Sequence, residues 1–91
     1  SQLLRVYASD GKVMAVTTRG EYLLKMRLYE VEKRLDKRSF VRISHSEIIN
    51  LKQVKKFDLS YTGTICVCFL DGSTSYVSRR NVAKIKEVLG L

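Results

Sequence analysis

The first part of the chain consists of three stretches rich in strand-forming residues, separated by turn dipeptides. Asp10-Gly11 and Arg19-Gly20 mark the two breaks, and Asp-Gly is typical of a tight hairpin turn. We therefore predict a three-stranded meander from the stretches LLRVYA (3–8), KVMAVTT (12–18) and EYLLKMR (21–27).

The apolar spacing then changes from the period of a strand to that of a helix. Leu28, Val31 and Leu35 form one apolar stripe, and Glu30 can pair with Arg34 on the exposed side. This pattern predicts a short amphipathic helix at about 28–36.

A second helical stripe ends the chain. Val82, Ile85 and Leu89 share one face, Ser78 is a suitable N-cap, and Gly90 can end the helix. We predict a helix at about 79–89.

Strand patterns return between the two helices. Residues 39–44 alternate, residues 45–50 (HSEIIN) are interpreted as a helical turn, and three more strand candidates follow at VKKFDL (54–59), GTICVCFL (63–70) and TSYVS (74–78). The predicted fold class is mostly β, with two short helices.

The net charge of the chain restricts the possible binding partners more than the chain length does. The 91 residues suit a single domain over 1–91, and 17 Lys and Arg against nine Asp and Glu give a net charge of +8. This balance favours nucleic acid first and an anionic membrane surface second, although a soluble domain can also simply be basic. No apolar run approaches the roughly 20 residues of a membrane span, and no signal peptide is visible. The chain begins without Met, so we expect a piece of a longer protein.

Residue types that support catalysis or metal binding are few. His45 is the only histidine, and no nucleotide-binding glycine motif is present. Cys66 and Cys68 fall on one face of a strand and are expected to be buried thiols on a core face, in a reducing cytoplasm. We therefore expect no enzyme activity, no catalytic residue, no metal, no cofactor and no small-molecule substrate.

Two segments carry groups suited to anions. Arg79 and Arg80 fall in the first turn of the last helix, where a bound phosphate would offset their unfavourable position, or where both can point into water. The second segment, FVRISHSEIIN (40–50), places hydroxyl, imidazole and guanidinium groups where a strand enters a turn; these are Arg42, Ser44, His45 and Ser46. Asn50 has a structural role open to it, as a turn-closing side chain.

These two segments together resemble the LytTR family of bacterial DNA-binding domains. The motifs are FVRISHSEIIN at 40–50 and LDGSTSYVSRR at 70–80, in that order, and the resemblance covers essentially the whole chain. It implies an elongated antiparallel β-sheet sandwich whose loops, rather than a recognition helix, enter successive major grooves. It also implies the C-terminal output part of a cytoplasmic transcriptional regulator that binds promoter direct repeats, as a dimer on double-stranded DNA.

The resemblance also implies roles for individual residues. Base contacts fall on Lys12, His45 and Arg80, and phosphate contacts fall on Arg42, Ser44, Ser46, Arg79, Asn81 and Lys84. Many family members have His at the position of Ser44, so the histidine here is shifted by one residue. The alternative is a basic RNA-binding or protein-interaction module without sequence-specific duplex recognition, which makes no membrane contact either.

Overall fold

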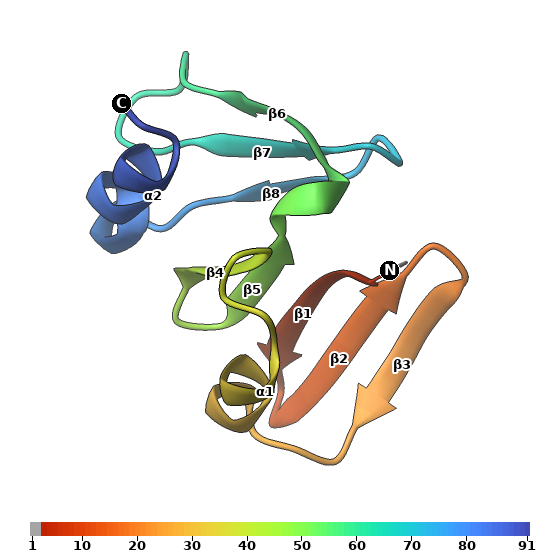
Figure 1. The fold of residues 1–91 in the computed structure, drawn as a ribbon. Helices are drawn as coiled ribbons and strands as arrows, with labels where there is room; N and C mark the ends of the chain where they lie inside the picture. Colours follow the sequence, from red (N-terminus) through yellow and green to blue (C-terminus); the bar gives the residue numbers. More distant parts are fainter. Residues whose placement is uncertain (1–2) are drawn as a thin grey trace.

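The computed structural model describes residues 3–91 and shows two antiparallel sheets arranged along one long axis (Figure 1). The first sheet has the order β3-β2-β1-β5-β4 and the second has the order β6-β7-β8. The principal extents are 35 × 25 × 24 Å, so the predicted elongated, mostly β class is confirmed. The first sheet contains β1 (Leu3–Ser9), β2 (Lys12–Thr17), β3 (Gly20–Leu24), β4 (Phe40–Ser44) and β5 (Glu47–Asn50), and the second contains β6 (Val54–Asp58), β7 (Cys66–Phe69) and β8 (Thr74–Tyr76).

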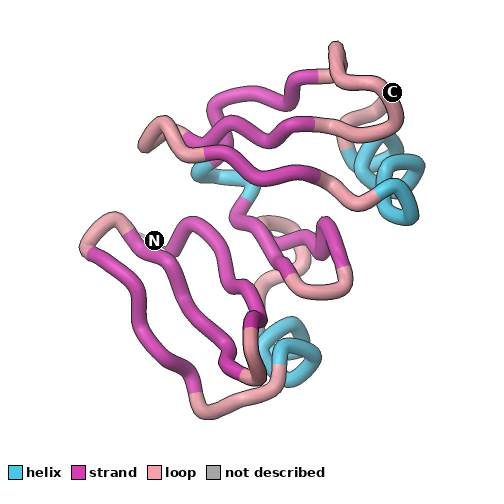
Figure 2. The backbone as a smooth tube through the Cα atoms, turned by 180° about the vertical axis from the view of Figure 1, so that it is seen from behind, coloured by secondary structure: helices cyan, strands magenta, loops and turns pink. Residues whose placement is uncertain are grey.

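The helical elements are short, and one of them, the 3-10 turn η1, lies between the two sheets (Figure 2). They are α1 (Leu28–Arg34), α2 (Val82–Val88) and the 3-10 turns η1 (Leu51–Gln53) and η2 (Arg79–Asn81). The helix predicted at 28–36 ends at Arg34, two residues earlier than predicted. The region predicted as one helix at 79–89 is a 3-10 turn, η2, followed by α2.

The predicted meander is formed by β1, β2 and β3. Asp10 and Gly11 both have positive φ angles, 52° and 75°, as a two-residue hairpin turn with the twist of the flanking strands requires. Asp tolerates this left-handed region better than most residues, and glycine adopts it freely. The turn therefore ends β1 at Ser9 and starts β2 at Lys12.

Glu30 has a different partner from the predicted one. Its carboxylate accepts a hydrogen bond from the backbone N–H of Arg27 at 2.9 Å, and no ion pair with Arg34 forms among residues 3–91. An acidic side chain in the first turn is well placed to satisfy a free backbone donor there. Glu30 therefore stabilises the start of α1 rather than its exposed side.

The prediction of a helical turn at 45–50 was wrong, because residues 47–50 form strand β5. β5 pairs with β1 along one edge and with β4 along the other, and its two faces pack in different hydrophobic clusters. Ile48 and Ile49 are consequently both buried, at 1% and 0% exposure. A strand covered on both faces lacks the apolar–polar alternation that would have distinguished it from a helical turn.

β5 connects two hydrophobic clusters. Ile48 packs under α1 with Val6 and Val31, whereas Ile49 packs between the two sheets with Phe69 and Ile85. Adjacent residues of one strand point to opposite faces, so β5 ties the position of α1 to that of the second sheet and α2.

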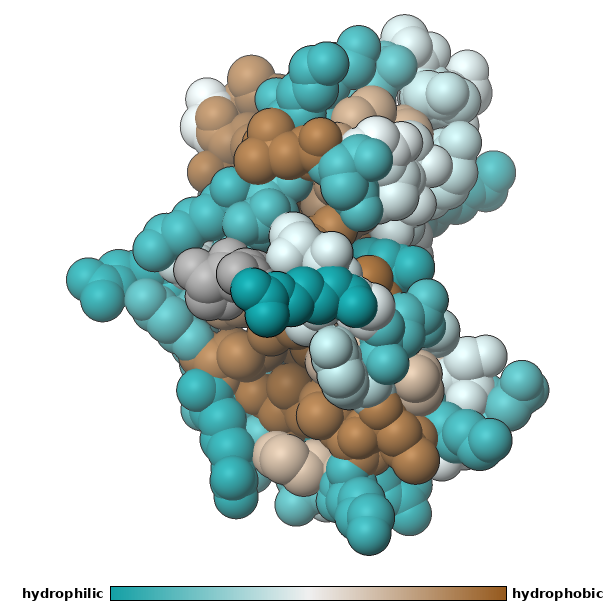
Figure 3. Space-filling model, turned by 90° about the vertical axis from the view of Figure 1, so that its right-hand side faces the viewer, coloured by the Kyte–Doolittle hydropathy of each residue, from teal (hydrophilic) through white to brown (hydrophobic). Residues whose placement is uncertain are grey.

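The face of the first sheet away from α1 carries both apolar and charged groups. Met14 and Leu23 are direct cross-strand partners there, and Leu23 is 57% exposed. Arg5 pairs with Glu47 at 3.1 Å on the same face. Figure 3 shows apolar side chains gathered in the lower half of one side of the molecule.

The prediction of two buried thiols on one core face is confirmed for Cys66, which is 2% exposed, and is wrong for Cys68. Cys68 is half-buried, and both cysteines lie on the face of β7 opposite to Val67 and Phe69, which fill the core between the sheets. Burial, the first cause, and the neighbouring Cys68 raise the pKa of the Cys66 thiol. No group of three potential metal ligands occurs within residues 3–91.

The predicted structural role of Asn50 is confirmed. Its side chain is 1% exposed, donates to the carbonyl of Leu3 at 2.7 Å and accepts from the backbone N–H of Lys52 at 3.0 Å. One buried amide thus connects β1, β5 and η1.

We expect Asn50→Ala to lower the free energy of unfolding by about 1–3 kcal/mol, because two buried hydrogen bonds disappear together. Urea denaturation followed by circular dichroism measures this change. The control is Asn81→Ala, which removes the chain's other asparagine at a half-buried position. Equal stability losses for the two variants would contradict the assignment.

Candidate nucleic-acid interface

Three loops that are far apart in the sequence lie side by side on one flank of the molecule. They are the β1–β2 turn at the bottom of Figure 1, the β4–β5 turn at its left, and the segment from Ser78 into η2 above the β4–β5 turn. Backbone hydrogen bonds join them, from Ala8 N to the Ser46 carbonyl at 2.8 Å and from Ser78 N to the Ile43 carbonyl at 2.9 Å. The relative positions of the three loops are therefore set by main-chain contacts.

Two surface depressions meet at His45. One is lined by Lys12, His45 and Ser46 together with Arg27 and Tyr29 from the start of α1. The other is lined by Ser44, His45 and Arg80, with Ser78 and Asn81. The structure thus brings the three predicted base-contacting residues into one row, with His45 between Lys12 and Arg80.

The side chains in this row are available to a ligand. Lys12, His45 and Arg80 are all exposed, and within residues 3–91 none of these side chains forms a hydrogen bond or an ion pair. Solvated cationic groups on loops of fixed position can donate hydrogen bonds to phosphates or to the acceptor groups of base edges.

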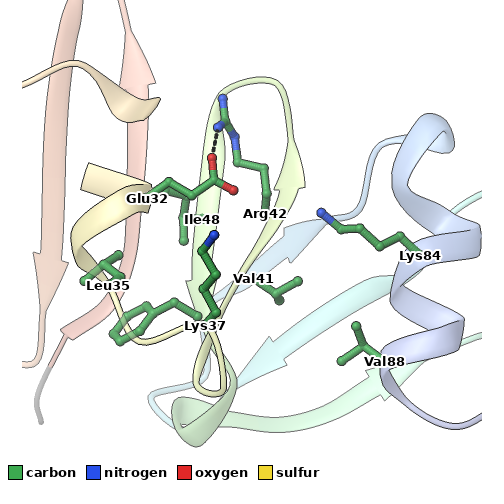
Figure 4. Close-up of a pocket in the computed structure, with 9 residues that line it drawn as sticks. Glu32, Leu35, Lys37, Val41, Arg42, Ile48, Lys84 and Val88 are labelled. Carbon is green, nitrogen blue, oxygen red and sulfur yellow. Dashed lines mark hydrogen bonds and ion pairs between the residues drawn. The ribbon is translucent and has the colours of Figure 1, made fainter. Parts of the chain in front are cut away.

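Arg42 uses its guanidinium group inside the protein instead. Nη1 pairs with Glu32 of α1 at 2.7 Å, Nε donates to the Ser44 carbonyl at 2.9 Å, and Nη2 donates to the His45 carbonyl at 2.6 Å. Figure 4 shows Glu32 and Arg42 facing each other across the gap between α1 and β4. This geometry differs from the predicted phosphate contact, because Arg42 braces the turn that carries His45.

The two serines of the β4–β5 turn have different environments. Ser44 Oγ accepts a hydrogen bond from the backbone N–H of Ser46 at 3.2 Å, so this side chain helps to close the turn. Ser46 is exposed at the rim of the turn, beside His45. Both hydroxyl groups remain on the side of the molecule that carries Lys12 and Arg80.

The predicted side-chain N-cap at Ser78 does not form. Ser78 Oγ accepts from Asn81 Nδ2 at 2.7 Å, and the first backbone bond runs from Asn81 N to the Ser78 carbonyl at 2.9 Å. This shorter hydrogen-bonding step makes residues 79–81 a 3-10 turn. The turn separates its two arginines: Arg80 lines the depression that contains His45, whereas Arg79 lines another one with residues 61–65 and Lys86.

Lys84 extends from α2 toward β4, into a groove between α1 and α2 (Figure 4). Lys37 lies on the opposite side of this groove. Sequence reasoning missed Lys37, which lies in this groove. It also missed Arg27 and Tyr29, which reach the flank because α1 packs beside the β1–β2 turn. Their spacing in the sequence contains no signal of this proximity.

Exposed cationic side chains on three loops gather on one flank of a mostly β fold, which is the charge distribution typical of a nucleic-acid-binding domain. The family model of the LytTr DNA-binding domain matches residues 1–90, and the chain therefore belongs to the LytTR family. The predicted family is confirmed, and it is a family of DNA-binding domains.

The descriptions of proteins similar in sequence are consistent with membership of this family. The chain is 37% identical over 91 residues to proteins described as uncharacterized HTH-type transcriptional regulators in Staphylococcus aureus strains NCTC 8325 and COL. The match covers 100% of this chain and 61% of each relative, so the chain spans about three fifths of their length. Within residues 3–91, α1 and α2 are separated by five strands, so the described part contains no helix-turn-helix.

A solved structure confirms the fold. A structure described as the LytTr DNA-binding domain of a putative methyl-accepting/DNA response regulator from Bacillus cereus superposes with a TM-score of 0.94 at 24% sequence identity. The match covers 99% of this chain and 83% of that chain. None of the helices within residues 3–91 is long and apolar enough to cross a membrane.

Proposed function

We propose that this domain binds double-stranded DNA sequence-specifically, as the C-terminal output part of a cytoplasmic bacterial transcriptional regulator. The observation that carries the proposal is the row formed by Lys12, His45 and Arg80, which are exposed, unpaired within residues 3–91 and positioned by main-chain bonds between their loops. In this proposal these three side chains contact bases in the major groove.

The dimensions of the molecule suit successive major grooves. Its long axis measures 35 Å, and one turn of B-DNA rises about 34–36 Å. A domain of this length that lies along the duplex can reach two openings of the major groove on one side. Two copies bound head to tail would then occupy a direct repeat, which is the dimeric arrangement we propose on DNA.

The phosphate contacts of the proposal surround the base-contacting row. Arg42 is assigned a positioning role, since its three donor directions already hold Glu32 and the β4–β5 turn. Arg42 can still add positive potential behind the turn. The groups proposed to hold the backbone are Ser44, Ser46, Arg79, Asn81 and Lys84.

A competition experiment tests the proposed function. We expect the domain to prefer a duplex recovered from a random library over random duplex and over single-stranded RNA, at both low and moderate salt. The alternative module for RNA or protein predicts equal affinity for the two duplexes. A single-stranded ligand would stack on exposed tyrosines, but Tyr22 and Tyr29 lie on separate elements. Tyr61 and Tyr76 do contact each other, but edge-on, so they do not present two parallel ring faces to successive bases.

Lys84→Ala should weaken binding to all duplexes by a similar factor and reduce the slope of log affinity against log salt by about one, because one phosphate contact is lost. Fluorescence anisotropy titrations at several salt concentrations measure the slope. Lys55→Ala, an exposed lysine on β6, is the matched control and should leave the slope unchanged. A Lys84 variant that alters base preference instead would contradict a phosphate role.

A further inference from the structure

The two adjacent arginines of η2 serve two separate surfaces. Arg80 lines the depression that contains His45, whereas Arg79 lines a depression formed by the β6–β7 connection and α2. The second depression also includes Lys86, and no acidic side chain lines it. It lies outside the row of Lys12, His45 and Arg80.

Gly63 gives Arg79 a defined place. The Nε, Cζ and Nη2 atoms of Arg79 lie 3.6, 3.9 and 3.9 Å from the position that a Cβ on Gly63 would occupy. The guanidinium group of Arg79 therefore lies in van der Waals range of the space that a side chain at position 63 would enter. Gly63 has a φ of 75°, in the left-handed region that glycine adopts without strain. Arg79 is therefore held beside the loop while the residue remains exposed.

The loop is anchored at its C-terminal end and contains several hydroxyl groups. Thr64 Oγ1 donates to the carbonyl of Val77, which directly precedes Ser78, and Val77 N donates to the Ile65 carbonyl at 3.0 Å. The ring of Tyr61 packs edge-on against Tyr76, with 5.6 Å between ring centroids. The positions of these groups are thus coupled to the segment that carries Arg80.

Asp58, an acidic residue at the start of the loop, is hydrogen-bonded within the loop. The carboxylate of Asp58 accepts from Ser60 Oγ at 2.6 Å and from Ser60 N at 3.0 Å, and these bonds lower the pKa of Asp58. The negative charge at the start of the loop is consequently satisfied within the loop. Arg79 and Lys86 form no ion pair within residues 3–91.

We propose that the loop of residues 59–64, Arg79 and Lys86 form a second phosphate-binding surface. This surface contacts the DNA backbone next to the segment that the base-reading loops contact, and it does so on only one of the two flanks of the DNA site. In Figure 1 the β6–β7 connection lies above α2, at the opposite end of the molecule from the β1–β2 turn. This location extends the flank at its C-terminal end. The inference rests on the proposed function. It adds that the contacted DNA segment is longer and extends in one direction along the duplex.

Neutralised phosphates test this surface directly. Two duplexes carry the selected site with methylphosphonate linkages in the left or the right flanking segment, and a third is unmodified. We expect the wild-type domain to lose at least fivefold in affinity on one modified duplex and little on the other. Arg79→Gln with Lys86→Gln should bind the unmodified duplex more weakly, with a salt slope lower by about two, and should no longer distinguish the three duplexes.

The matched control is Arg19→Gln with Lys55→Gln, which removes the same charge from exposed residues of other elements and should discriminate as the wild type does. Thermal melting checks that both variants are folded. A double variant that still loses the same factor on the modified flank would overturn the inference, and so would a wild type indifferent to both flanks. If the wild type prefers no duplex sequence at all, the proposed function fails instead.

Discussion

Replacing Arg80 with alanine is expected to weaken binding to the best duplex site by about 1–3 kcal/mol and to relax base preference at a single position. The reason is geometric. Arg80 is exposed beside His45, and η2 directs it away from Arg79. Its side chain forms no hydrogen bond or ion pair within residues 3–91. A guanidinium fork in that position can donate two hydrogen bonds to O6 and N7 of guanine.

Titrations against the selected duplex and its single-base variants measure both effects. Arg80→Lys is the informative companion, because it keeps the charge and loses the two-pronged geometry. We expect this variant to retain general affinity and to lose most of the base preference. If Arg80→Ala leaves affinity and base preference intact, the role of Arg80 is wrong.

Arg42→Ala is expected to affect stability and DNA binding together. The guanidinium group holds Glu32 and two carbonyl groups of the β4–β5 turn, and its side chain is only 20% exposed. Hydrogen bonds that involve a charged group contribute about 1.5–3 kcal/mol, so we expect the free energy of unfolding to fall by about that amount. Specific binding should fall at least tenfold, because the turn that carries His45 loses its support.

Chemical denaturation and DNA titration on the same samples separate the two possible roles of Arg42. Glu32→Gln is the matched control, since it removes the ion pair and leaves the bonds to Ser44 and His45 in place. We expect this variant to be intermediate in both measurements. Unchanged stability with uniformly weaker binding and a lower salt slope would instead support a direct phosphate contact by Arg42.

Local patterns predicted most strands, the meander and both helical regions, because each depends on residues close in the sequence. The failure at 45–50 has a physical cause. Ile48 and Ile49 are buried on opposite faces of β5, and pairing with β1 across more than forty residues creates that environment. No local periodicity reports such a contact.

The candidate site also combines features that the local sequence predicts with features that depend on tertiary contacts. The residue types at Lys12, His45 and Arg80 were visible in the sequence, and the resemblance related them to one another. The ion pair of Arg42 depends on Glu32 of α1, and Arg79 lies beside Gly63 of the β6–β7 connection. Both are consequences of tertiary packing, which spacing along the chain does not encode.

Selection from a random duplex library most directly tests the claim that this domain reads DNA sequence through its three loops. The account predicts recovery of a shared motif present twice in the same orientation, with a separation close to a whole number of helical turns. It also predicts that the motif loses one defined base when Arg80→Ala is selected in parallel. A recovered pool with no shared motif, bound no more tightly than the starting library, would contradict the account.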